Sequence, residues 1–211
     1  MDRTFFRSCF RRLFPAALAT TSVIFAFSGN LDARLVSKNL GKAPDFALTD
    51  QNGKKTSLAD LKGHVWIADF IFTRCQTLCP LMTNQMALLE KRLGPSGARF
   101  VSFSVDPEHD DPKTLLEYAR KYNANADRWV FLTGEKEALW KLSSEGFRLG
   151  VDEVSPDEIK AGAQPILHSS HFVLVDREGT IRGFYDSSEP AKLEELTQDA
   201  EALLTEKKGN Q

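Results

Sequence analysis

Cysteine is scarce in this chain of 211 residues, which contains only 3. That is too few for a disulfide framework, and a chain of this length can bury a hydrophobic core without one. Neither sign of charge dominates, because 27 Lys and Arg stand against 29 Asp and Glu. This balance gives no basis for nucleic acid as a partner. The chain also lacks internal repeats and low-complexity tracts, which excludes solenoids and fibres.

Residues 1–29 differ from the rest of the chain. The stretch MDRTFFRSCFRR (1–12) is basic, and the uncharged run LFPAALATTSVIFAFSG (13–29) follows it. This run is shorter than the ~20 residues that a helix needs to cross a bilayer. Both a cleaved export signal and an uncleaved membrane anchor therefore remain open. Either way, the following domain is expected on the exported, periplasmic side of the membrane.

The remaining sequence predicts one α/β domain, residues 44–206, between a polar linker (30–43) and a short tail (207–211). Apolar runs predict buried strands at 65–72, 98–105 and 129–134, and amphipathic patterns predict helices at 81–93, 111–122, 135–145 and 189–206. Turn signals predict one hairpin within 45–63 and another at 171–185. The segment 147–165 reads as an irregular insertion.

The motif FTRCQTLCP (72–80) places Cys75 and Cys79 directly after the first buried strand and before a helix. Sites of open α/β sheets cluster at the carboxyl ends of strands, and a helix amino end lowers the pKa of a cysteine. Polar neighbours in the loop argue against two inert, packed cysteines. A reversible disulfide and a clamp for a soft cation such as Cu(I) both remain open. Cys9 precedes the apolar run, so we assign it to the targeting segment.

Two sulfur atoms do not complete the coordination of most metals, so the histidines matter. His64 precedes the central strand, at the opposite end from the cysteines. His109 lies in the loop after the next strand, on the same edge of the sheet as the cysteines. His168 and His171 stand at the entry to the second hairpin, from which one of them could reach the cysteine loop. A histidine considered alone is more often a surface or structural residue than a ligand.

Several stretches together resemble the Sco/SenC family of copper-binding proteins, over about residues 41–204. They are GKAPDFALTDQNG, LADLKG, DFIFTRCQTLCP, SFSVDPEHDDP and LHSSHFVLVDREGTIRGFYD. The resemblance implies a thioredoxin-like fold: a central mixed sheet flanked by helices, with an N-terminal hairpin extension. It also implies that Cys75, Cys79 and His168 bind one copper ion per chain, as Cu(I) or Cu(II). His171 corresponds to a neighbour of the ligand, and His109 replaces an arginine of the family pattern.

By the same resemblance, the expected function is that of a copper metallochaperone for cytochrome c oxidase. Such a protein delivers copper to the oxidase copper centre or prepares the thiols of that centre. The implied partners are a copper-accepting oxidase subunit or another copper chaperone, and the membrane through the N-terminal segment. The alternative is a thiol-disulfide oxidoreductase that acts through Cys75 and Cys79. A peroxidase fits less well, because Thr73 lies too close to the first cysteine and Pro80 follows the pair.

Overall fold

A seven-stranded mixed sheet forms the centre of residues 38–206, the part of the chain described by this computed structural model. The order across the sheet is β2-β1-β5-β4-β3-β8-β9. The strands are β1 (Ala47–Asp50), β2 (Lys55–Ser57), β3 (Trp66–Ile71), β4 (Arg99–Ser104), β5 (Trp129–Thr133), β8 (His171–Val175) and β9 (Ile181–Asp186). β3, β4 and β5 run parallel, and the outer strands pair antiparallel.

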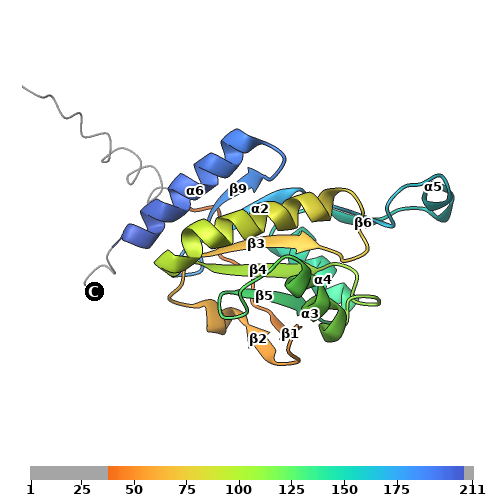
Figure 1. Cartoon of the computed structure of the whole chain (residues 1–211), viewed down its shortest axis with the longest axis horizontal. Helices are drawn as coiled ribbons and strands as arrows, with labels where there is room; N and C mark the ends of the chain where they lie inside the picture. The colour runs from red at the N-terminus through yellow and green to blue at the C-terminus, as the bar shows by residue number, and fades with distance from the viewer. Residues whose placement is uncertain (1–37, 207–211) are drawn as a thin grey trace, which may run out of the picture.

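Helices cover both faces of this sheet, as the burial of every residue of β3 requires. They are α2 (Leu78–Leu93), α3 (Pro112–Lys121), α4 (Lys136–Lys141) and α6 (Pro190–Thr205). α2 and α6 run side by side across one face (Figure 1). Arg92 of α2 joins them by ion pairs with Glu194 and Glu201 of α6. α3 joins α2 on this face, because the Tyr118 hydroxyl lies 2.8 Å from the Thr83 hydroxyl.

The predicted core strands and long helices are confirmed, with shifts at their ends. α2 begins at Leu78, three residues earlier than predicted, so Cys79 lies within its first turn. Asp111 is the N-cap of α3, because its carboxylate accepts a hydrogen bond from Thr114 N at 2.7 Å. The helix predicted at 135–145 is α-helical only to Lys141 and continues as a π-helical turn, Leu142–Gly146. Both predicted hairpins are present, as β1–β2 and β8–β9.

An arm projects from the end of the sheet at which the cysteines lie, and its order corrects the prediction of an irregular segment. β6 (Val151–Glu153) pairs antiparallel with β7 (Ile166–His168), and the short helix α5 (Pro156–Lys160) lies between them. Figure 1 shows α5 at the far end of the arm. Most of these residues are solvent-exposed, so their sequence carries no apolar alternation to predict a strand. His168 is the last residue of β7 and lies at the base of this arm.

The predicted N-terminal segment and tail, and most of the linker, lie outside the described residues. The last linker residues lie against the β8–β9 turn, where Ala43 N donates a hydrogen bond to Gly179 O at 2.8 Å. Within residues 38–206, no helix is both long enough and apolar enough to cross a membrane.

Candidate metal centre

The two cysteines lie where the chain leaves β3 and enters α2. Phe72 N lies 3.5 Å from the Cys79 sulfur, and Cys79 N lies 3.3 Å from the Cys75 sulfur. Both N–H groups therefore donate to sulfur, and the first turn of α2 adds the positive end of its dipole. Cys79 is fully buried, whereas 6% of Cys75 is exposed. Cys75 and Cys79 do not form a disulfide in the structure. Because Cys75 is the more exposed of the two, its sulfur is the one that an external group can approach.

His168 reaches the cysteines from the base of the arm. Its Nε2 lies 3.0 Å from the Cys79 sulfur, and its Nδ1 lies 3.0 Å from the carbonyl oxygen of Ser169. A proton on Nδ1 satisfies that carbonyl and leaves the lone pair of Nε2 directed toward the sulfur atoms. The ring also stands edge-on to Phe72, with 5.7 Å between ring centroids. The ligand atoms of Cys75, Cys79 and His168 all lie within 4.8 Å of one another.

The two thiols have opposite acidities. The hydrogen bond from the Cys79 thiol is the largest of the effects that lower the pKa of Cys75 to about 3, and burial opposes it. Burial, followed by its hydrogen bond to Cys75, raises the pKa of Cys79. At neutral pH the pair therefore holds one thiolate, at Cys75, and one buried thiol. That arrangement is suited to a soft metal ion, which displaces the remaining proton, and also to thiol-disulfide exchange.

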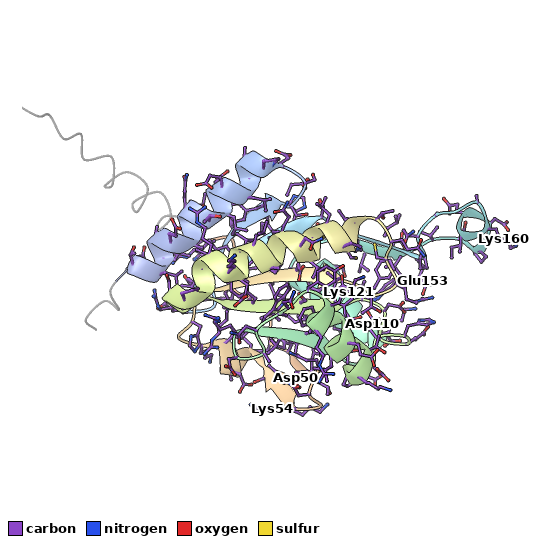
Figure 2. All side chains as sticks on the ribbon, viewed as in Figure 1. Asp50, Lys54, Asp110, Lys121, Glu153 and Lys160 are labelled. Carbon is purple, nitrogen blue, oxygen red and sulfur yellow. The ribbon has the colours of Figure 1, made fainter. Side chains whose placement is uncertain are left out.

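The loop after β4 holds the cysteine loop in place. The buried carboxylate of Asp110 accepts hydrogen bonds from Thr73 N at 3.1 Å, from the Thr73 hydroxyl and from the Ser104 hydroxyl at 2.6 Å. Asp106 binds the Arg74 guanidinium at 2.8 Å. Both contacts fall on the two residues that precede Cys75. Figure 2 labels Asp110 at the end of the sheet from which the arm projects.

An open cleft of about 860 Å³ leads to Cys75. The cysteine loop, the end of α3 at Lys121 and the far part of the arm line this cleft. The Gln164 side chain crosses it at one point, because its Oε1 accepts a hydrogen bond from Gln76 N at 3.2 Å. Figure 2 labels Lys121 beside the base of the arm and Lys160 at the tip. The cleft provides a route by which a partner's side chain can reach Cys75.

The other three histidines lie outside this group of ligands. His64 precedes β3, at the end opposite the cysteines. The Nδ1 of His171 lies 3.0 Å from the Ser169 hydroxyl. His109 belongs to a second cluster with Asp106 and Glu108, whose ligand atoms also lie within 4.8 Å of one another.

Sequence reasoning missed two buried acids beside the cysteines. Asp110 lies within the stretch SFSVDPEHDDP, and Asp69 lies within the apolar run VWIADFIF, where neither has a predicted role. An acidic residue in the middle of a predicted buried strand could have marked Asp69 as a candidate functional residue, because buried acids need a partner or a function. The sequence carried no comparable signal for the Asp110–Thr73 contact, which joins two loops.

The donor set defines the chemistry that the centre can perform. Two sulfur atoms and one imidazole nitrogen are soft donors that suit Cu(I) and also accommodate Cu(II). Structural zinc sites use four protein ligands, one more than this cluster offers. Hard cations such as Mg²⁺ and Ca²⁺ prefer oxygen.

The fold and this cluster together define a thioredoxin-like protein with a Cys-x-x-x-Cys and histidine centre. The chain belongs to the SCO1/SenC family, because the sequence model of that family matches residues 37–205. A solved SCO1/SenC family lipoprotein from Bacillus anthracis superposes with a TM-score of 0.70 at 35% identity, covering 79% of this chain and 98% of that one.

Two further solved structures are similar. BsSco, described with a disulfide switch and as a member of the Sco family of cytochrome c oxidase assembly proteins, superposes with a TM-score of 0.68 at 35% identity. This match covers 80% of the present chain and 97% of BsSco. ScoI from Bradyrhizobium japonicum, solved with copper bound, gives a TM-score of 0.64 at 25% identity and covers 77% and 99% of the two chains.

Proposed function

We propose that this protein binds one copper ion through Cys75, Cys79 and His168 and carries it on the exported side of a membrane. The observation that carries the proposal is the approach of two sulfur atoms and one imidazole nitrogen to within 4.8 Å, although 89 positions separate Cys79 from His168. Soft donors in this number match three-coordinate Cu(I). The copper-bound ScoI structure supports the same assignment.

The partner we propose is a copper-accepting subunit of cytochrome c oxidase, or another copper chaperone that serves it. BsSco, 35% identical to this chain, is named as a member of a family of cytochrome c oxidase assembly proteins. The basic and then uncharged N-terminal sequence supports a membrane-attached or exported protein. The lipoprotein character of the Bacillus anthracis relative supports membrane attachment as well.

A second candidate function is thiol-disulfide exchange with the cysteines of the same target. The low pKa of Cys75 and the buried thiol of Cys79 favour it. In this reaction the Cys75 thiolate attacks a target disulfide, and one target thiolate leaves. The Cys79 thiol then attacks the mixed disulfide, so that a Cys75–Cys79 disulfide forms and the second target thiolate leaves with the Cys79 proton. The target is thereby reduced by two electrons and the present pair is oxidised.

The discriminating experiment is an anaerobic Cu(I) titration of the reduced, full-length chain beside its His168→Ala and His171→Ala variants. Copper carriage predicts tight one-to-one binding, a large loss of affinity in His168→Ala and none in His171→Ala. Reduction of glutathione disulfide is measured on the same samples. Activity in that assay, together with copper binding that His168→Ala leaves unchanged, would refute the ligand assignment and favour the exchanger.

A further inference from the structure

Asp69 is a buried acid at the centre of the sheet. It is fully buried in β3, between Ala68 and Phe70, and β3 has buried neighbours on both sides, β4 and β8. Within residues 38–206, neither of its carboxylate oxygens has a hydrogen-bond partner of normal geometry. Burial raises the pKa of Asp69 to about 7. The Ser102 hydroxyl, directly across on β4, lowers this pKa but only partly offsets the effect of burial. Buried carboxylates without partners are rare, because they lose hydration without replacement.

The carboxyl group lies on the face of the sheet that α2 covers. Ser102 is opposite Asp69 and accepts a hydrogen bond from the Trp129 indole at 2.9 Å. The Trp129 ring stacks on Phe131, which contacts Tyr118 of α3, and α3 and α2 share this face. Because successive strand residues point to opposite faces, Asp69 and its neighbour Phe70 face apart. Asp69 therefore lies beneath the helix whose first turn carries Cys79.

Asp69 is electrostatically coupled to two of the three proposed copper ligands. His168 lowers the pKa of Asp69 against the larger effect of burial, and Asp69 contributes to the raised pKa of Cys79. No hydrogen bond joins Asp69 to either ligand in the described part of the chain. Asp69 also lies only three positions before Phe72, whose N–H contacts the Cys79 sulfur at 3.5 Å. The carboxyl group is therefore near the centre without being one of its ligands.

The net charge of the copper-bound centre indicates what effect the Asp69 carboxylate would have on it. Two thiolates and a neutral imidazole give a net charge of −1 with Cu(I) and zero with Cu(II). A further negative charge nearby attracts the divalent ion more strongly than the monovalent ion. The copper ion in turn favours the ionised form of the carboxyl group.

We propose that Asp69 is a positioning residue that biases the centre toward Cu(II) by placing a buried negative charge behind Cys79 and His168. This inference rests on the copper function proposed above. A buried carboxylate without partners destabilises the fold, and the proposed role explains why one is present here. The three ligands determine that copper binds, whereas Asp69 adjusts which oxidation state of copper binds more tightly.

The test compares Asp69→Asn with Asp199→Asn in the full-length chain. Asp199 is a matched control, because it is a buried acid on α6 whose carboxylate accepts a hydrogen bond from the Tyr185 hydroxyl at 2.6 Å. Affinities for Cu(I) and for Cu(II) are measured separately by competition with chelators, and the midpoint potential of the bound copper is recorded. We expect Asp69→Asn to lower the ratio of Cu(II) to Cu(I) affinity by about tenfold or more and to raise the potential. Asp199→Asn should leave both unchanged.

The outcomes separate this inference from the function on which it rests. If the unmodified chain binds neither ion, the copper function is wrong and this role of Asp69 is wrong with it. If the unmodified chain binds both ions and Asp69→Asn changes neither the ratio nor the potential, the role of Asp69 alone is refuted. If Asp69→Asn does not fold, Asp69→Ser, which also removes the charge, is measured against the same prediction.

Discussion

Two clusters of three potential metal ligands lie at the same end of the sheet, and they differ in almost every other respect. In each, the ligand atoms lie within 4.8 Å of one another. The first, Cys75–Cys79–His168, combines two buried sulfurs with a half-buried imidazole. The second, Asp106–Glu108–His109, combines two carboxylates with an imidazole, and both Glu108 and His109 are exposed.

The second cluster is already occupied by the protein's own groups. Asp106 accepts hydrogen bonds from Arg74 at 2.8 Å and from the Nδ1–H of His109, 2.9 Å away. Glu108 lies 4.0 Å from the Lys136 ammonium. Arg74 and Lys136 are cations that neutralise these carboxylates. The sulfurs of the first cluster contact N–H groups, a hydroxyl, an imidazole and each other, none of which is a fixed cation. Proximity alone therefore does not make a metal site; the donors must also be free of competing cations.

The largest predicted effect is at the buried sulfur. Cys79→Ser replaces a soft donor with a weakly binding hydroxyl and should lower Cu(I) affinity far beyond the roughly 10–100-fold change typical of residues outside the ligand set. Cys75→Ser should do the same. Chelator competition under anaerobic conditions measures the loss, and Cys9→Ser is the matched control that should bind normally. Tight binding retained by either site variant would point to a different centre.

The next effect concerns the acidity of Cys75. With its pKa at about 3, this thiol remains ionised as the pH falls from 8 to 5, where an ordinary thiol becomes protonated. The rate of alkylation by iodoacetamide should therefore stay nearly constant over that range. The rate for free glutathione should fall by roughly tenfold for each pH unit. Peptide mapping by mass spectrometry assigns the modified residue. A rate at Cys75 that falls in parallel with that of glutathione would contradict the predicted acidity.

A smaller effect is expected where the two loops meet. Asp110→Ala removes the acceptor of the Thr73 hydrogen bonds and should lower the free energy of unfolding by about 1–3 kcal/mol. Copper affinity should fall by about tenfold, because the cysteine loop loses its support. Asp111→Ala is the matched control: it removes the N-cap of α3 and should cost about 1 kcal/mol of stability without changing copper affinity. Equal copper affinities in the two variants would show that the Asp110 contact does not position the cysteines.

The smallest effect is predicted at the second cluster. His109→Ala and Glu108→Gln should each leave copper affinity and stoichiometry unchanged, because their partners in the folded chain are Asp106 and Lys136. A titration that reports a second copper ion in the unmodified chain and loses it in His109→Ala would overturn the distinction between the clusters.

The parts of this fold that could be predicted from sequence are those in which burial imposes a pattern. β3 and α2 carry long apolar signals, and the turn between β8 and β9 has its own sequence signature. The arm was unpredictable, because its short strands are mostly exposed. Cys75 and Cys79 stand out in the sequence because they are only four positions apart. His168 joined them only through the family resemblance, since no local pattern reports a contact across 89 positions.

X-ray absorption of the copper-loaded, full-length chain and of its His168→Ala and His171→Ala variants tests the proposed ligand set directly. We expect two sulfur scatterers and one imidazole around copper, and loss of the imidazole signal in His168→Ala but not in His171→Ala. An imidazole signal that persists in His168→Ala, or a copper site without sulfur, would contradict it.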